Sequence, residues 1–291
     1  MALLNGHSRE EYPSGDSYEG QFKRGARHGN GTYYCVDGSR FEGAFQEGQM
    51  EGKGAYFYVN NEQYEGEWHA SLRSGYGKFT YSDGSSFEGR WLADLRHGQG
   101  LMRYADGAMY SGQWEDDQRQ GQGQMSFADG GHYNGGWANN ARRGRGILKL
   151  PNGGSYEGEF VEDTPAGEGR QNDTDENSSY EGQFQEGLRH GQGSCEYSKS
   201  GEKFSGEWTR GSRLSGVLFC ANGEVLRVGY LNDILVRHEK LSKKDQEREV
   251  KKSKGELVED EEPEEGGDSV EAAQPAAKVA LSGPAEAVEA H

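Results

Sequence analysis

The sequence is poor in the residues that usually fill a compact hydrophobic core. Only 32% of its 291 residues are hydrophobic, and the mean hydropathy is -1.02. Leucine, isoleucine and valine are scarce, whereas glycine is abundant (47 residues) and aromatic residues make up 11%. A simply disordered chain would lack those aromatic residues. Glycine combined with aromatic residues is instead typical of many short strands and turns.

Basic residues are also outnumbered. The 32 Lys and Arg residues stand against 49 Asp and Glu residues, which gives a formal net charge of -17. Nucleic acid and anionic membrane surfaces repel such a chain at long range. The charge therefore argues against nucleic acid as a partner and disfavours membrane lipid.

Cysteines are few, and no targeting segment is evident. Cys35, Cys195 and Cys220 lie far apart without paired spacing, which predicts reduced thiols and neither a disulfide framework nor a zinc site. The first residues, MALLNGHSREE, contain no hydrophobic stretch long enough for a signal peptide or a membrane span. We therefore expect a location in the cytosol or the cytoskeleton.

An internal repeat is the main feature of the sequence, and its first motif is aromatic-x-Gly-x-aromatic. Successive copies are 23 residues apart six times and then 24 residues apart twice. The first aromatic residue of each copy is Tyr18, Phe41, Tyr64, Phe87, Tyr110, Tyr133, Tyr156, Tyr180 or Phe204. Such a constant period is the signature of a repeat architecture.

A second motif, Gly-x-Gly-x-apolar, follows each copy of the first, as in Gly29-Asn-Gly31-Thr-Tyr33. Turn dipeptides such as Asp37-Gly38 and Asn152-Gly153 then lead into the next copy and supply the positive φ angles of tight hairpins. Aromatic residues and glycines alternate with polar residues, which predicts half-buried strands.

The fold expected from these motifs is all-β: an elongated, twisted antiparallel sheet of about nine 23-residue β-hairpin repeats. Nine units of two strands each would span roughly 85 Å. The expected divisions are an N-terminal segment (1–11), the repeat array (12–236), a charged segment with helical potential (237–255) and a disordered acidic, Ala- and Pro-rich tail (256–291).

Several units depart from the pattern. Residues 167–179 lack the usual apolar positions, so we expect a ragged strand there. Met50, Pro165 and Leu214 replace an arginine that most units carry before the first glycine. Residues 224–236 form a degenerate, more apolar final unit, suited to capping the stack or to dimerisation.

These motifs resemble the MORN-repeat family, whose units read approximately Tyr-x-Gly-x-Trp and then Gly-x-Gly-x-aromatic. The resemblance covers residues 12–230. The phrases beginning at Arg27, Arg96 and Arg189 (Arg-His-Gly) are most similar to radial-spoke-head MORN proteins of cilia. The resemblance implies structural and tethering roles in axonemes, basal complexes and membrane junctions.

An arginine recurs two residues before the first glycine of the second motif, and stacked units would align these arginines as a ladder. One interpretation is pairing with loop acids such as Asp94, Asp116 and Glu186. The other is a docking edge for an acidic partner, such as a tubulin-like surface or lipid headgroups. The ladder residues are Arg27, Arg73, Arg96, Arg119, Arg142 and Arg189.

The tryptophan column has two interpretations as well. Most of it must be core, because little else is available to bury. Part of the concave face would stay open for a peptide or a helix of a partner. The candidate partner-binding residues in this column are Trp68, Trp91, Trp114 and Trp137.

The sequence offers no catalytic, cofactor or metal site. The Gly-x-Gly motifs lack the third glycine and the following helix of a dinucleotide fingerprint. The acidic stretch starting at Asp173 has Ser178 and Phe184 where a calcium loop needs glycine and glutamate. His28, His97 and His190 occupy equivalent positions on different units, too far apart to share a metal ion.

We therefore predict a non-enzymatic scaffold or adaptor that binds proteins of a cytoskeletal or axonemal complex, with its C-terminal repeats as a surface for a homodimer. Its expected location is the cytoplasm and the cytoskeleton, in the axoneme of a cilium or flagellum. The alternative function is a peripheral phosphoinositide- or membrane-binding tether.

Overall fold

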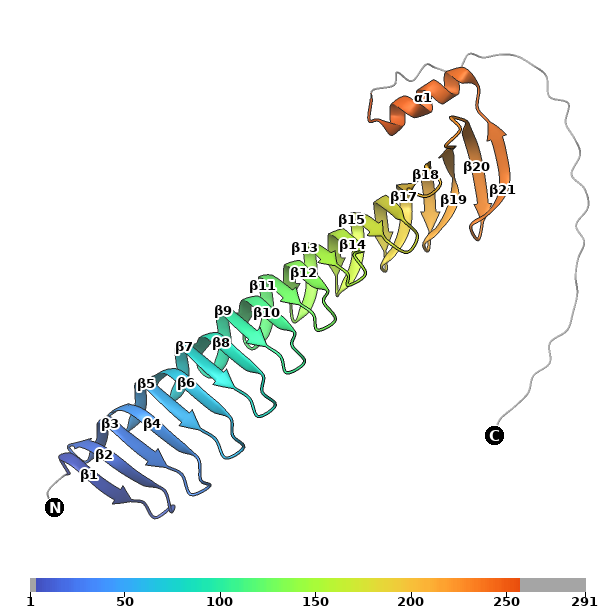
Figure 1. Cartoon of the computed structure of the whole chain (residues 1–291). Helices are drawn as coiled ribbons and strands as arrows, with labels where there is room; N and C mark the ends of the chain where they lie inside the picture. Colours follow the sequence, from blue (N-terminus) through green and yellow to red (C-terminus); the bar gives the residue numbers. More distant parts are fainter. Residues whose placement is uncertain (1–3, 257–291) are drawn as a thin grey trace, which may run out of the picture.

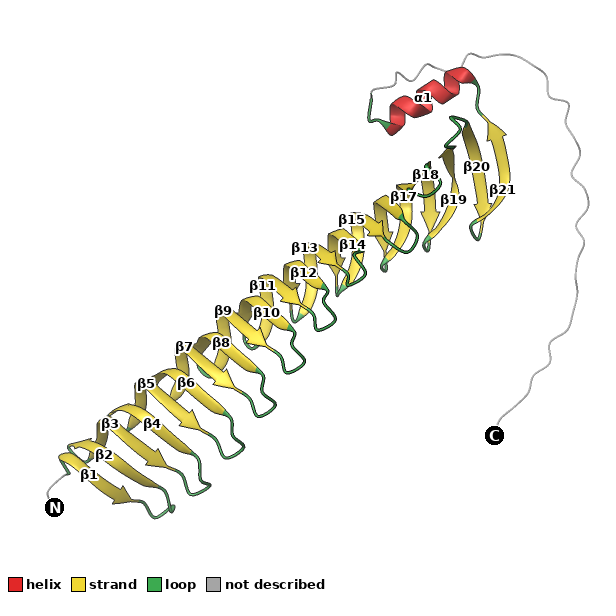
Figure 2. Cartoon of the chain, viewed as in Figure 1, coloured by secondary structure: helices red, strands yellow, loops and turns green. Residues whose placement is uncertain are grey.

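The computed structural model describes residues 4–256. These residues form one antiparallel sheet of 21 strands, followed by the helix α1 (Lys243–Ser253), as Figures 1 and 2 show. Each strand pairs with the next strand along the chain, so the sheet grows in one direction. The prediction of an all-β, elongated array of hairpin repeats is confirmed.

Each unit of the array is a hairpin of two strands. The strands that carry the first motif, or its counterpart at the end of the array, are β2 (Ser17–Lys23), β4 (Arg40–Gln46), β6 (Gln63–His69), β8 (Ser86–Leu92), β10 (Met109–Glu115), β12 (His132–Ala138), β14 (Ser155–Val161), β16 (Ser178–Gln185), β18 (Glu202–Thr209) and β20 (Val225–Leu231). The strands that follow them are β3 (Ala26–Tyr34), β5 (Gln49–Phe57), β7 (Leu72–Thr80), β9 (Leu95–Arg103), β11 (Gln118–Ser126), β13 (Ala141–Lys149), β15 (Thr164–Asp173), β17 (Leu188–Tyr197), β19 (Ser212–Phe219) and β21 (Ile234–Lys240). One further strand, β1 (Gly6–Glu11), precedes the first unit.

A β-bulge bends the hairpin of every unit. In β10 and β11 the register shifts between Gly112 and Gln113, whereas the pairing of β9 with β10 runs without interruption. Bulges add an unpaired residue and bend the bulged strand. The bends let the aromatic residues at the two ends of each first strand converge on one face, which we call the aromatic face; the other face is the polar face.

The core of the array is a zigzag of aromatic rings on the aromatic face. Tyr110 lies edge-to-face with Trp114 of its own strand, at a centroid distance of 5.3 Å, and with Trp137 of the next unit, at 5.2 Å. Trp137 in turn contacts Tyr133 in the same geometry. The pattern repeats from Phe22 to Tyr230, so each unit completes the core of its neighbour. Edge-to-face contacts of this kind stabilise beyond the area they bury.

Glycines leave the space that these rings occupy. The Tyr110 ring covers Gly112 and Gly123, which face each other on neighbouring strands. A Cβ atom on Gly123 would lie 2.6 Å from Cε2 of Tyr110. The Tyr110 hydroxyl donates to the carbonyl of Gln113 at 3.0 Å, which satisfies the buried polar atom.

The sheet extends beyond residues 12–236 at both ends. At the N-terminal end, β1 pairs with β2 over its whole length, so most of the expected N-terminal segment belongs to the sheet. At the C-terminal end, β21 continues the sheet to Lys240, and Ser242 caps α1 by accepting from the backbone of Asp245. The tail predicted for 256–291 lies, from residue 257 onward, outside the described residues.

The expectation of a ragged strand in residues 167–179 is wrong. There β15 pairs with β16 from Gly167 to Asp173 without a break. Backbone hydrogen bonds to the regular strands on either side hold β15, although Gln171 replaces the apolar residue of the other units. Strand pairing here depends more on the neighbours than on apolar side chains of the strand itself.

We expect the array to unfold at alkaline pH. Burial raises the pKa of Tyr110, Tyr133 and Tyr156 to about 12, against an ordinary value of 10.0. Because the raised pKa belongs to the folded state, the stability from these groups is complete below about pH 10 and is lost as the pH rises toward about 12. Tyrosinate absorbance of the core residues should therefore rise together with loss of β-sheet circular dichroism. Core tyrosines that ionise near pH 10 in an intact sheet would contradict this expectation.

Candidate partner-binding surfaces

The ladder arginines join each unit to the next, and Arg96 shows the geometry. Its backbone N–H and its Nε donate to Oδ1 of Asp117 at 3.0 and 2.7 Å, and its Nη2 donates to the Asp117 carbonyl at 3.0 Å. The Asp117 N–H donates back to the Arg96 carbonyl at 3.2 Å. The guanidinium carbon lies 4.3 Å from the centroid of the Trp114 ring, a cation–π distance. We call this arrangement the arginine clip.

Arg73 and Arg142 form the same clip with the unit that follows, and Arg119 forms it without the Nε contact. Their partners lie 21 residues further along the chain, in the tight turn between the two strands of that unit. The side-chain partners are Asp94 for Arg73, Asn140 for Arg119 and Asp163 for Arg142.

The turn residues of the clips adopt left-handed backbone conformations. Asp94, Asp117 and Asp163 have φ angles of 71°, 67° and 67°. Asp and Asn tolerate this region better than most residues other than glycine. These residues therefore provide a side-chain hydrogen-bond acceptor for the arginine at a turn position where glycine is otherwise favoured.

The pairing with loop acids agrees with the sequence interpretation only in part. Asp94 is the partner that we expected, but Arg96 pairs with Asp117 instead of Asp116. The carboxylate that Arg189 contacts belongs to Glu176 instead of Glu186, at 3.2 Å. The turn that faces Arg189 contains Gly211, which has no side chain to accept a hydrogen bond.

Arg213 is a further ladder residue, which the motif spacing did not identify. Arg213 lies opposite Trp208, donates to Asp233 and stacks on Tyr230, so the assignment of Leu214 to the ladder position was wrong by one residue. The bulge in this unit contains one residue fewer than in the other units. The arginine opposite the tryptophan therefore lies three residues before the paired glycine, Gly216, instead of four. The residues opposite Trp208, read from the strand register, identify Arg213 correctly.

Arg189 is the most deeply buried ladder arginine, with 8% of its surface exposed. It contacts Gln171, Ser178 and the Cys195 thiol inside the array. Desolvation raises the pKa of Cys195, which is fully buried. This polar group replaces the apolar packing of the other units.

The four candidate tryptophans lie in the core. Their exposed fractions are between 3% and 5%. Trp68, Trp91 and Trp137 each donate their indole N–H to a glycine carbonyl of the preceding unit at 3.1–3.2 Å. Packing between units thus accounts for the tryptophans, and clips account for most of the ladder. Partner binding through either set stays a prediction.

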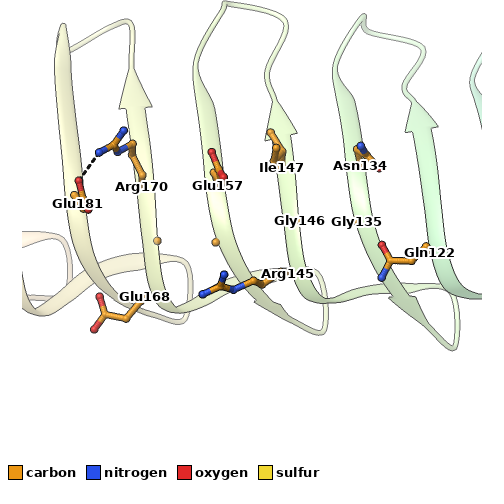
Figure 3. Close-up of a pocket in the computed structure, with 12 residues that line it drawn as sticks. Gln122, Asn134, Gly135, Arg145, Gly146, Ile147, Glu157, Glu168, Arg170 and Glu181 are labelled. Atoms are coloured by element: carbon orange, nitrogen blue, oxygen red, sulfur yellow. Dashed lines mark hydrogen bonds and ion pairs between the residues drawn. The ribbon is translucent and has the colours of Figure 1, made fainter.

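The polar face carries exposed charged side chains in cross-strand rows. Figure 3 shows a shallow hollow on this face, where Arg170 of β15 reaches Glu181 of β16 at 2.6 Å. Arg145 and Ile147 of β13 line the same hollow beside Glu157. This face offers a broad, hydrophilic contact surface, in contrast to the filled aromatic face.

The described residues hold no group of three or more His, Cys, Asp or Glu side chains arranged to bind a metal ion. The three histidines of the Arg-His-Gly phrases lie on β3, β9 and β17, on separate units. No helix within residues 4–256 is long and apolar enough to cross a membrane.

Comparisons with solved structures give only distant likenesses. The TCP10 domain of Danio rerio CPAP is 10% identical, with 80% of this chain and 100% of that chain covered and a TM-score of 0.36. The SAS-4 (dCPAP) TCP domain of Drosophila melanogaster, solved in complex with a proline-rich motif of Ana2, is 8% identical, with 60% and 88% covered and a TM-score of 0.33. No curated protein matches the sequence.

The family model of the MORN repeat matches eight consecutive segments. They are residues 18–40, 41–63, 64–86, 87–109, 110–132, 133–155, 156–176 and 180–202. The segments cover more than half of the chain, and each begins at the first aromatic residue of a unit. The chain therefore belongs to the MORN-repeat family.

Proposed function

We propose that this chain is a non-enzymatic scaffold or adaptor that binds protein partners along its extended repeat surface. MORN-repeat proteins are generally non-catalytic scaffolds. The observation that carries the proposal is the unbroken pairing of 21 strands, because one continuous sheet holds its surface groups at fixed spacing over a long distance. Such a surface suits a partner that makes repeated contacts.

We further propose that it is a structural component of a ciliary or cytoskeletal assembly. The Arg-His-Gly phrases support this assignment through their similarity to radial-spoke-head MORN proteins. An acidic partner has two ladder positions available: among the described residues, Arg27 and Arg119 have no carboxylate partner.

Affinity purification of the full chain from ciliated cells, combined with proximity labelling, tests the proposal. We expect enrichment of axonemal or other cytoskeletal proteins and a loss of capture with Arg119→Glu. The control is Arg103→Glu, which changes an exposed residue at the end of β9 and leaves the ladder intact. Equal capture by both variants would contradict the proposal that the arginine ladder docks a partner. Absence of cytoskeletal proteins would contradict the proposed ciliary or cytoskeletal assembly.

Lipid tethering is the alternative function. Most ladder arginines already have intramolecular partners, which leaves few cations for headgroups, and the net charge of -17 opposes an anionic membrane. We expect no flotation of the full chain with phosphoinositide liposomes. Flotation that Arg119→Glu abolishes would favour the tether.

The C-terminal end is our proposed surface for a homodimer. Among the described residues no strand pairs with the outer edge of β21, where Ile234 and Val236 are 68% and 62% exposed. An unpaired apolar edge favours pairing with another chain, whereas the charged β1 at the opposite end is protected. Sedimentation velocity should show a dimer that Val236→Lys dissociates; a monomer at all concentrations would contradict it.

A further inference from the structure

Three tyrosines at equivalent positions of consecutive units border the aromatic face. Tyr58, Tyr81 and Tyr104 are each the first residue after the second strand of a unit, and 23 residues separate neighbours. We call them the tyrosine row. The corresponding residue of the next unit, Phe127, keeps the ring but lacks the hydroxyl, so the complete row spans three units.

The core and the turns hold the row in place. The Tyr58 ring lies 4.5 Å from the Tyr56 ring and 5.7 Å from Phe79 of the next unit. The Tyr81 ring lies 4.5 Å from Phe79. The backbone N–H of Tyr81 donates to the Ser85 carbonyl at 2.9 Å. The three residues are only partly buried, and none of their hydroxyl oxygens is among the fully buried polar atoms that lack a partner in residues 4–256, so the hydroxyls are accessible to solvent.

The hydroxyls of the row differ from those of the core. Tyr64 and Tyr110 donate theirs to backbone carbonyls of their own strands at 3.0 Å. Within residues 4–256, the hydroxyls of the tyrosine row make no hydrogen bond to another group. They are therefore available as donors to an external carbonyl.

The arginine clips lie beside the row. Burial raises the pKa of Tyr58, with Arg73 opposing this shift and Asp94 adding to it. Burial likewise raises the pKa of Tyr81, where Arg96 opposes the shift. The Arg73 guanidinium lies 5.2 Å from the Phe79 ring on which Tyr58 and Tyr81 pack, so aromatic rings and an ion pair lie close together at this part of the row.

The spacing of the row discriminates between classes of ligand. Equivalent residues of neighbouring units are two strand spacings apart, about 9.4–9.8 Å. A polyproline II helix repeats every three residues, about 9.3 Å. An α-helix presents equivalent faces every seven residues, about 10.5 Å, and falls out of step by roughly 2 Å over the two intervals of the row. The spacing favours polyproline II.

We propose that the tyrosine row binds a proline-rich segment of a partner protein in the polyproline II conformation. Each tyrosine packs against every third residue of the segment, and its hydroxyl donates to a backbone carbonyl of the ligand. Those carbonyls are free, because polyproline II has no internal hydrogen bonds. The inference rests on the proposed function, namely that the array binds proteins, and it names the class of segment recognised.

The experiment uses decaproline as the probe and a glycine–serine peptide of equal length as its control, with NMR shifts of the isotope-labelled full chain as the readout. We expect saturable shifts at the tyrosine row with decaproline and none with the glycine–serine peptide. Absence of saturable binding at millimolar peptide, or shifts confined to another surface, would overturn the proposal.

A triple substitution, Tyr58→Phe, Tyr81→Phe and Tyr104→Phe, keeps the rings and removes only the hydroxyls. We expect binding about tenfold weaker, with the thermal midpoint retained. The control replaces the exposed tyrosines of the polar face, Tyr34→Phe and Tyr76→Phe, and should bind as tightly as the natural chain. Unchanged affinity in the triple variant would contradict the proposed hydrogen bonds.

The two proposals fail in different ways. If ciliated cells yield cytoskeletal partners that the triple variant captures equally well, the scaffold stands and the tyrosine row is not its proline-rich site. If decaproline binds at the row but no partner is captured, the peptide site stands and the proposed assembly is wrong.

Discussion

Replacing Tyr110 by alanine is expected to lower the free energy of unfolding by about 3–5 kcal/mol. The ring is fully buried, contacts Trp114 and Trp137 edge-to-face, and donates a hydrogen bond to the Gln113 carbonyl. Stability in a repeat array comes from contacts between neighbouring units. The cavity that alanine leaves therefore weakens the contact between the unit of Tyr110 and the next unit along the chain. Chemical denaturation monitored by circular dichroism measures the loss.

Tyr76→Ala is the matched control for this substitution. It removes the same side chain from the polar face, where Tyr76 is 55% exposed and its hydroxyl contacts Glu88. We expect a change of less than about 1 kcal/mol. Similar losses for the two variants would mean that the aromatic zigzag is not the core of the array.

Adding a single methyl group at Gly123 is expected to destabilise the array by about 3 kcal/mol. A Cβ atom there would meet the Tyr110 ring at 2.6 Å, and that ring cannot retreat because Trp114 and Trp137 flank it. Thermal unfolding of Gly123→Ala measures the effect as a lowered midpoint.

The control for Gly123→Ala is Gly229→Ala in β20. A Cβ atom at Gly229 would lie 3.7 Å from Cβ of Arg237, an ordinary contact. The backbone there has no left-handed φ angle, so the substitution tests space alone. We expect little change for Gly229→Ala; an equal fall in both variants would show that loss of chain flexibility, not the ring, sets the requirement for glycine.

Much of the fold could be predicted because the positions of the aromatic residues and glycines within each repeat indicate how its two strands pair. The constant spacing of the aromatic and glycine motifs gave the hairpin unit, the face on which Tyr18 and Phe22 lie, and the stacking of units. The positions of β1 and β21 could not be predicted. Neither strand carries the motif, and both form because the neighbouring strand offers free backbone groups.

The alignment of the arginines as a ladder could be predicted from the sequence, but the partner of each arginine could not. Their partners lie in a second class of turn that uses Ala93-Asp94, Asp116-Asp117 and Glu162-Asp163 instead of a glycine dipeptide. The signal was present, since Asp and Asn favour left-handed turn positions. In each clip the arginine meets the second residue of the turn, 21 residues further along the chain, and only the strand register shows that this residue, not the acid before it, faces the arginine.

Consecutive hairpins share one continuous sheet, and a distance along the array tests this arrangement most directly. Nitroxide labels at Glu19→Cys in β2 and Glu157→Cys in β14, with Cys35 and Cys220 replaced by serine, are separated by twelve strand spacings. Pulsed electron–electron double resonance should then give a narrow distribution of distances between the two nitroxides, centred near roughly 58 Å. A broad distribution, or a distance below about 40 Å as in a compact domain of this size, would contradict the account.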